Sequence, residues 1–66
     1  MTVTVNGEPR EVPAGTTVEQ LVTELTGARS GVAAAINGDV LPRRTWASTP
    51  LTDRDVVEVV TAVQGG

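Results

Sequence analysis

This 66-residue chain contains no histidine, cysteine, lysine, tyrosine or phenylalanine. The usual protein nucleophiles and the side chain that titrates near neutral pH are therefore missing, so the serines and threonines have no base to activate them. Without cysteine no disulfide can form and no thiolate can bind a metal, which fits a reducing compartment. Asp53 and Asp55 lie in one short turn, where we expect water to solvate both. We therefore expect a protein that is not an enzyme and that binds no metal or cofactor itself.

Long apolar runs and basic clusters are also missing. No segment approaches the roughly 20 apolar residues of a membrane span, and the first residues have no signal-peptide character, so we expect a soluble, cytoplasmic protein. The formal net charge of −3 argues against a nucleic-acid partner, which requires a basic face. We expect the adjacent pair Arg43-Arg44 in a solvated loop. Trp46 is the only aromatic residue, so Val, Leu, Ile and Ala must form the core of one small domain.

The first part of the chain predicts a β-hairpin. Residues 2–5 alternate polar and apolar side chains, which is the period of a strand with one buried face. Asn6-Gly7 is a strong signal for a hairpin turn, because both central positions of that turn need a positive φ. Residues 10–12 form a short returning strand, and Pro9 and Pro13 limit its pairing.

An amphipathic helix is predicted over residues 18–26. A capping box begins at Thr17, with Gln20 as its partner, or one residue earlier. We expect Gly27 to follow the helix in the left-handed conformation. A helix this short must pack its apolar stripe on a sheet to be stable. That stripe has helical spacing and consists of Val18, Leu21, Val22 and Leu25.

The second half predicts further strands. Residues 31–36 form a strand of small residues, which the Asn37-Gly38 turn joins to a brief strand that Pro42 ends. We assign this turn and Asn6-Gly7 no function beyond turning the chain. Residues 43–50 are expected to be an irregular crossing, in which Trp46 covers a small core. After a turn at residues 53–55, residues 56–60 are the most strand-like segment of the chain.

This order of elements predicts an α+β fold of the β-grasp, or ubiquitin-like, type. We expect a mixed four- to five-stranded sheet with one helix packed across it. The last strand should lie at the centre of the sheet and lead directly into the C-terminal residues. Residues 1–62 would form the domain, and residues 63–66 an extended, flexible tail.

The tail ends in Gly65-Gly66. Without Cβ atoms these residues can pass through a channel that any side chain would block, and they leave the terminal carboxylate sterically open. The alternative is a frayed end without a role. The C-terminal carboxylate is the one group in the chain that remains open to unusual chemistry.

The chain resembles the ThiS family, the sulfur-carrier proteins of thiamine (thiazole) biosynthesis, over nearly its full length. One departure is Arg54, because the turn of the family is usually Asp-Gly-Asp. The resemblance rests on Val5-Asn6-Gly7-Glu8, Val18 with Leu21, Asn37-Gly38 with Val40, Pro42 and Arg43, Trp46, Leu51, Asp53-Arg54-Asp55, Val57-Glu58 and Ala62-Val63-Gln64-Gly65-Gly66.

The resemblance implies a carrier mechanism. An E1-like adenylating enzyme of the ThiF type, using ATP and Mg²⁺ that belong to that enzyme, activates the carboxylate of Gly66. A sulfur donor then converts it to a thiocarboxylate, which a thiazole synthase of the ThiG type consumes. Gly65 provides reach, and Val63 and Gln64 set the extended approach to the partner.

The alternation in the last strand also predicts a docking patch. Val56, Glu58 and Val60 should share the open face of the sheet beside the tail, where exposed valines can contact a partner. The alternative is that neighbouring strands cover the valines, or that they are scattered apolar surface residues. We also expect Asp53, Asp55 and Glu58 to gather acidic charge near the start of the tail, where it meets a basic partner or merely belongs to a solvated turn.

Three other functions remain open. The small subunit of molybdopterin synthase (MoaD) has the same fold and Gly-Gly end, but its members tend to be longer, with aromatic residues before the tail. A ubiquitin-like protein modifier is the second; without lysine this chain cannot build lysine-linked chains on itself. The third is an interaction module or one subunit of a larger enzyme, and such a module should keep its function when Gly66 is deleted.

Overall fold

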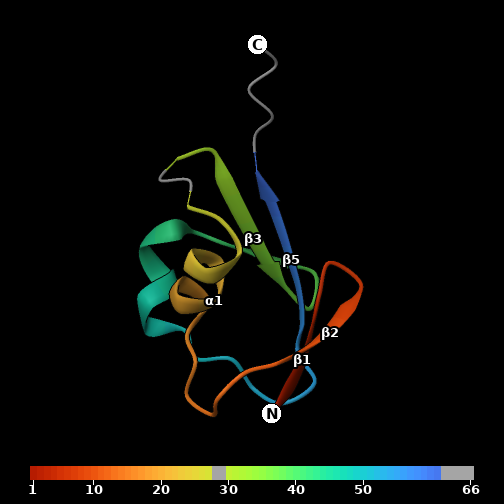
Figure 1. Ribbon diagram of the computed structural model, residues 1–66. Helices are drawn as coiled ribbons and strands as arrows, with labels where there is room; N and C mark the ends of the chain where they lie inside the picture. The colour runs from red at the N-terminus through yellow and green to blue at the C-terminus, as the bar shows by residue number, and fades with distance from the viewer. Residues whose placement is uncertain (28–29, 62–66) are drawn as a thin grey trace.

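The polar–apolar alternation of the chain produces a mixed sheet with helices on one side (Figure 1). The computed structural model describes residues 1–27 and 30–61. The elements within these ranges are β1 (Thr2–Val5), β2 (Glu8–Glu11), α1 (Val18–Leu25), β3 (Val32–Ile36), β4 (Asp39–Leu41), the 3₁₀ helix η1 (Arg43–Ser48) and β5 (Val56–Thr61).

The five strands of the described residues have the spatial order β2-β1-β5-β3-β4. β5 lies at the centre, parallel to β1 and antiparallel to β3. The last strand of the chain therefore joins the N-terminal hairpin to the second strand pair. This arrangement confirms the predicted β-grasp fold and the predicted central place of the last strand.

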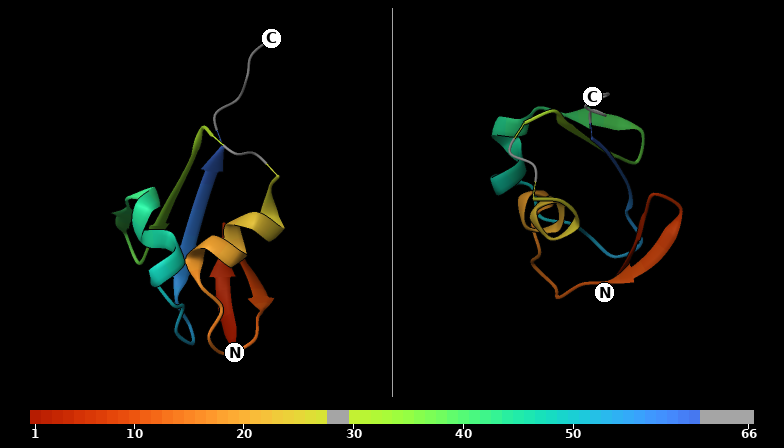
Figure 2. Two further views of the ribbon diagram at one scale, coloured as in Figure 1. Left: turned by 90° about the vertical axis from the view of Figure 1, so that its left-hand side faces the viewer. Right: turned by 45° about the horizontal axis from the view of Figure 1, so that its top comes forward.

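α1 crosses one face of this sheet (Figure 2). Thr17 caps it with a complete capping box to Gln20, so the later of the two predicted helix starts is correct. Val18 and Leu21 are fully buried beneath it. The prediction for Gly27 is wrong. Thr26 already adopts an extended conformation with φ −149°, and its N–H donates to the carbonyl of Val22, so the chain leaves the helix without a left-handed residue.

The N-terminal hairpin is longer than predicted. β2 begins at Glu8 and includes Pro9, which pairs with Thr4. A proline is compatible with this position because β2 is an edge strand, with no neighbour on its outer side among the residues that the structure describes. Val12 lies just past the strand, buried, and its N–H donates to the carbonyl of Met1 over 2.9 Å.

The segment predicted as an irregular crossing contains η1. Its first turn closes with a bond from the N–H of Thr45 to the carbonyl of Pro42 over 2.9 Å. Trp46 is 3% exposed, and its indole N–H donates to the carbonyl of Leu41 over 3.1 Å. η1 packs beside α1 and covers the core, as predicted for Trp46. A 3₁₀ helix of 6 residues is too short for a repeating apolar pattern, which explains why the sequence did not indicate it.

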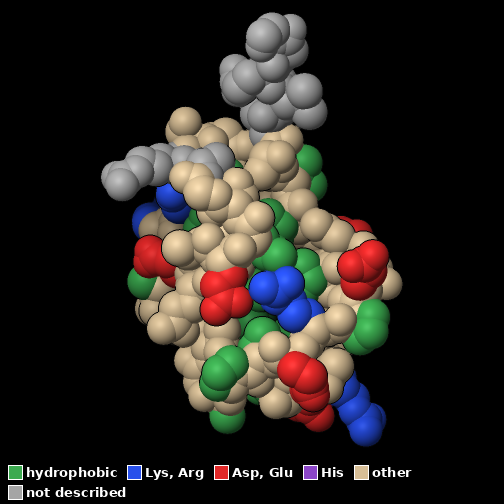
Figure 3. Space-filling view, in the orientation of Figure 1, with side chains coloured by type: hydrophobic (Ala, Val, Ile, Leu, Met, Phe, Trp, Pro, Cys, Tyr) green, Lys and Arg blue, Asp and Glu red, His purple; other side chains and the backbone are tan. Residues whose placement is uncertain are grey.

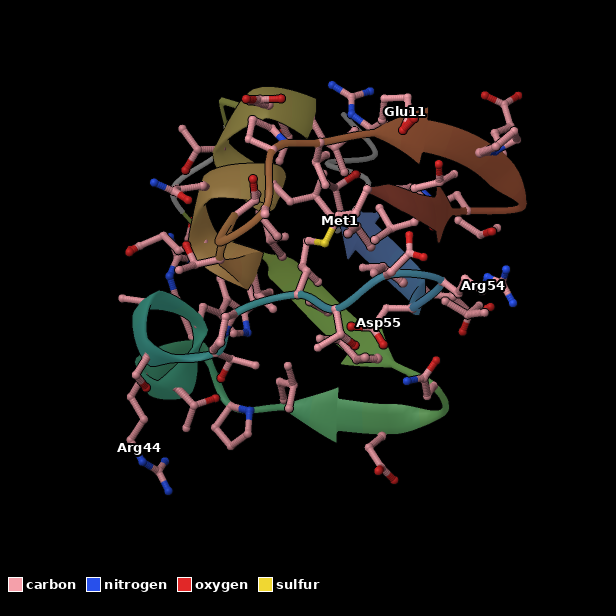
Figure 4. The ribbon with its side chains drawn as sticks, turned by 90° about the horizontal axis from the view of Figure 1, so that it is seen from below. Met1, Glu11, Arg44, Arg54 and Asp55 are labelled. Atoms are coloured by element: carbon pink, nitrogen blue, oxygen red, sulfur yellow. The ribbon has the colours of Figure 1, made fainter. Side chains whose placement is uncertain are left out.

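The adjacent arginines begin this helix and stay at the surface. The guanidinium of Arg43 lies 5.2 Å from the centre of the Trp46 ring, in cation–π range. Arg44 points away from the domain (Figure 4). The core consists of Val3, Val5, Val12, Val18, Leu21, Val22, Ala34, Trp46, Leu51 and Val57.

Candidate functional site: the central strand and the surface around its end

β5 connects the core of the domain to its C-terminal residues. It runs from the end of the molecule that carries the N-terminus toward the opposite end (Figure 1). The predicted sulfur-carrying Gly66 and the predicted tail residues Gly65, Gln64 and Val63 follow it and lie outside the described residues. Their roles, like the domain boundary at residue 62, therefore remain predictions.

The side chains of β5 alternate as the sequence predicts. Val57 is fully buried, whereas Val56 and Val60 on the other face are 47% and 64% exposed. Glu58 is exposed between them. Ala33 of β3 lies opposite Val60, so small side chains flank this row. α1 and η1 both lie on the other side of the sheet (Figure 2), so no described helix covers the face that carries Val56, Glu58 and Val60.

The acidic turn lies at the wrong end of β5 for the predicted charge cluster. Residues 52–55 precede the strand, so its full length of 6 residues separates Asp55 from residue 62. Asp53 accepts a bond from the N–H of Thr2 over 2.9 Å and keeps its side chain 60% exposed. The prediction that acidic charge gathers near the start of the tail is therefore wrong.

Asp55 is also not solvated as predicted, because it is only 9% exposed. Its carboxylate accepts bonds from the backbone N–H of Thr52 over 2.8 Å, the hydroxyl of Thr52 over 2.9 Å and the amide of Asn37 over 3.1 Å. Burial acts to raise the pKa of Asp55, but these hydrogen bonds outweigh it and the pKa lies below the ordinary value of 3.8. Asp55 is therefore a structural carboxylate.

Position 54 is where the turn departs from the Asp-Gly-Asp that is usual in the family, and its structure shows why an arginine fits there. Arg54 has φ 72°, in the left-handed region that glycine adopts without strain. Its side chain is 91% exposed and points away from the domain, while Asp55 points inward (Figure 4). Arg54 thus keeps the backbone of a glycine-type turn, at the conformational cost of a Cβ atom.

Asn6 and Asn37, which the sequence indicated only as turn residues, make side-chain contacts with β5. Asn6 bonds to both the N–H and the carbonyl of Val59, and Asn37 accepts a bond from the N–H of Val56. The residue type itself indicated such contacts, because asparagine combines tolerance of a positive φ with a side chain that has the donor and acceptor of a peptide group. The sequence did not indicate which backbone groups that side chain reaches.

A shallow hollow lies beside the end of β5, on the face between α1 and the β1–β2 hairpin. Asn6, Leu25, Thr26, Val59 and Thr61 line this hollow. The middle of the same face carries hydrophobic side chains beside a basic one (Figure 3). The last described residue of β5 therefore borders a partly apolar depression.

Two negative findings concern the described residues alone. Across residues 1–27 and 30–61, no group of three or more aspartate, glutamate, histidine or cysteine side chains is placed to hold a metal ion. In the same ranges, no helix is long and apolar enough to cross a membrane.

A β-grasp sheet with its C-terminal strand at the centre defines the class of ubiquitin-like proteins. The sequence model of the ThiS family matches residues 3–66, which is nearly the whole chain. This protein belongs to the ThiS family, as its sequence motifs predicted.

Relatives in sequence and in structure agree with this membership. A Thermus thermophilus protein named "Sulfur carrier protein ThiS" is 39% identical over 64 residues, which cover 97% of this chain and 98% of the relative. The crystal structure of the thiamine biosynthesis protein ThiS from Geobacter metallireducens superposes with a TM-score of 0.81 at 35% identity and covers both chains fully. A Magnetococcus marinus protein named "Thiazole synthase" is 39% identical over 66 residues, which are all of this chain and 20% of that protein.

Proposed function

We propose that this protein is a sulfur carrier for thiazole formation in thiamine biosynthesis, and that the carboxylate of Gly66 carries the sulfur. The observation that carries the proposal is the match to the ThiS family, which extends to the last residue and so includes Gly65-Gly66. The name and nearly complete coverage of the Thermus thermophilus relative support the same function.

The chemistry explains why a carrier needs a partner enzyme. A C-terminal carboxyl group has a pKa of about 3.3–3.7, so at neutral pH it is an ionised and poor electrophile. In the proposed sequence an E1-like enzyme of the ThiF type supplies ATP and Mg²⁺. A carboxylate oxygen attacks the α-phosphorus of ATP and releases pyrophosphate, and a sulfur nucleophile then displaces AMP to leave a thiocarboxylate.

The carrier itself contributes shape and no catalysis. The sequence has no histidine, cysteine, lysine or tyrosine that could act as base or nucleophile in either step. Gly65 and Gly66 have no side chains, so they fit a channel that leads to the bound nucleotide. Val63 and Gln64 would guide this approach by backbone pairing.

The open face of β5 is the proposed docking surface for the adenylating enzyme. Val60 is 64% exposed and Val56 47% exposed, so apolar surface is available without unfolding. Glu58 lies between them and can pair with a basic group of the partner. Because all three lie on the strand that precedes the tail, docking there places the tail toward the active site of the partner.

The consumer of the thiocarboxylate would be a thiazole synthase of the ThiG type. The Magnetococcus marinus thiazole synthase contains, within one fifth of its length, a segment similar to this whole chain. Fusion of the two in one polypeptide supports a physical association of carrier and synthase.

An intact-mass measurement tests the proposal. The protein is incubated with a ThiF-type enzyme, ATP, Mg²⁺ and sulfide, and we expect a mass increase that matches replacement of one oxygen by sulfur. Deletion of Gly66 should abolish the increase, because the terminal carboxylate is then that of Gly65 and lies one residue short of the reacting position. An unchanged mass, with an enzyme shown to activate another carrier, would contradict the proposal. Loss of the added sulfur on mixing with thiazole synthase and its substrates would assign the pathway.

A further inference from the structure

The second half of β5 has no backbone neighbour from β1. The parallel pairing of the two strands covers Thr4 with Val56 and Val5 with Val57. The backbone N–H of Asn6 still donates to the carbonyl of Val57 over 2.9 Å. The chain then turns away, because Asn6 and Gly7 have φ 51° and 85° and lead into β2.

The side chain of Asn6 takes the place of the missing neighbour. Its Oδ1 accepts a bond from the N–H of Val59 over 2.9 Å, and its Nδ2 donates to the carbonyl of the same residue over 3.2 Å. A carboxamide has the same donor and acceptor as a peptide group, so it extends the hydrogen-bond ladder by one residue. Both bonds join residues 53 positions apart in the sequence.

Val59 lies close to the point where the described strand ends. Only Val60 and Thr61 follow it in β5, and Thr61 borders the hollow that Asn6 also lines. We propose that Asn6 is a positioning residue: β3 pairs with one side of the last part of β5, Asn6 holds the other side, and the two together direct the C-terminal residues that carry the sulfur. The functional part of this inference rests on the proposed function.

Asn37 provides an internal comparison. It stands at the same position of the second Asn-Gly turn and has the same φ of 51°. Its side chain accepts a bond from the N–H of Val56 over 2.9 Å and donates to Asp55, and its N–H donates to the carbonyl of Val56 over 2.7 Å. It therefore holds the first residue of β5, at the end far from the tail.

The test compares Asn6→Gly with Asn37→Gly. Glycine accepts the positive φ of both turns, so each variant keeps its turn and loses only side-chain bonds. In Asn6→Gly we expect the backbone order parameters of Val60 and Thr61, measured by ¹⁵N relaxation, to fall below those of the unsubstituted protein, although pairing with β3 still holds the other side of the strand. In Asn37→Gly these values should stay at the level of the unsubstituted protein.

Adenylation kinetics provide the second measurement. Loss of two hydrogen bonds at the end of β5 should lower the kcat of a ThiF-type enzyme for Asn6→Gly by about three- to tenfold. The KM should stay within about twofold, because the docking face is unchanged. Asn37→Gly, which removes at least as many bonds, should leave kcat unchanged where both variants are folded.

Unchanged order parameters in Asn6→Gly, or equal losses of kcat in the two variants, would overturn the inference. If the unsubstituted protein is not adenylated at all, the proposed function fails. The relaxation comparison then still decides whether Asn6 holds the end of β5.

Discussion

Asp53, Arg54 and Asp55 show how three adjacent polar residues acquire different roles. Asp53 accepts a bond from the N–H of Thr2 at the surface, and Arg54 supplies the left-handed turn with φ 72°. Asp55 folds under this turn and accepts three hydrogen bonds from Thr52 and Asn37. The sequence shows two equivalent aspartates, and only the direction of the turn distinguishes them.

The lowered pKa of Asp55 predicts a stability that depends on pH. Hydrogen bonds to the charged form stabilise the folded state above the ordinary pKa of 3.8, and this contribution is lost as the pH falls through the lower pKa of the folded protein. At pH 7 we expect Asp55→Asn to lower the free energy of unfolding by about 1–3 kcal/mol, since an amide cannot accept all three bonds. The difference from the unsubstituted protein should shrink below pH 4, as measured by urea unfolding.

Asp53→Asn is the matched control. Asp53 has a largely exposed side chain, and asparagine keeps an oxygen that can accept the bond from Thr2. We expect a change within about 0.5 kcal/mol at pH 7. Equal losses in the two variants would show that Asp55 has no special role in the fold.

η1 shows what a short element adds to a small domain. It has only 6 residues, yet it places the one aromatic side chain of the chain over the core beside α1. The indole of Trp46 also satisfies the carbonyl of Leu41, at the point where β4 ends. A core built from valine, leucine and alanine is thus closed by a single large residue.

Substitution of Trp46 tests this role of η1. Trp46→Phe keeps most of the apolar volume but removes the hydrogen bond from the indole N–H to the carbonyl of Leu41, so we expect a loss of about 1–2 kcal/mol. Trp46→Ala leaves a cavity and should cost about 3–5 kcal/mol, which approaches the whole stability of a domain of this size. Urea unfolding followed by circular dichroism measures both. A loss below about 1 kcal/mol for Trp46→Ala would show that η1 is not needed to close the core.

The whole molecule has two unlike faces, which the central strand connects. α1 and η1 cover one face, and Val57 points into the core beneath them. The other face carries Val56, Glu58 and Val60 without a covering helix among the described residues. This division leaves one side of the domain for folding and the other for the proposed docking of a partner.

Substitution on the open face tests the docking proposal. Val60→Asp should lower kcat/KM for adenylation by about tenfold or more, because a charge then enters an apolar contact. The fold should be unaffected, since the side chain is 64% exposed. Ala47→Asp is the control, because Ala47 is exposed on η1, on the opposite side of the sheet (Figure 2). Unfolding of Val60→Asp, or an equal kinetic loss in Ala47→Asp, would contradict docking through β5.

Most of the fold could be predicted from local patterns. The period of two in residues 2–5, the apolar stripe of α1 and the run of valines in β5 indicated their elements correctly. The backbone conformation at Gly27 and the helix η1 could not be predicted. The conformation at Gly27 depends on how the chain leaves α1, and η1 is stabilised by the packing of Trp46 rather than by a repeating pattern.

The amino-acid sequence determined the helix α1, the strands and their inner faces, and the lack of nucleophilic and basic side chains, because these follow from residue type and spacing along the chain. It also contains the motifs of the ThiS family, which the family match confirmed. The tertiary structure decided which aspartate is buried and which backbone groups Asn6 and Asn37 hold. The side-chain contacts of Asn6 and Asn37 join residues from 18 to 53 positions apart, so they arise only when the sheet brings distant segments together.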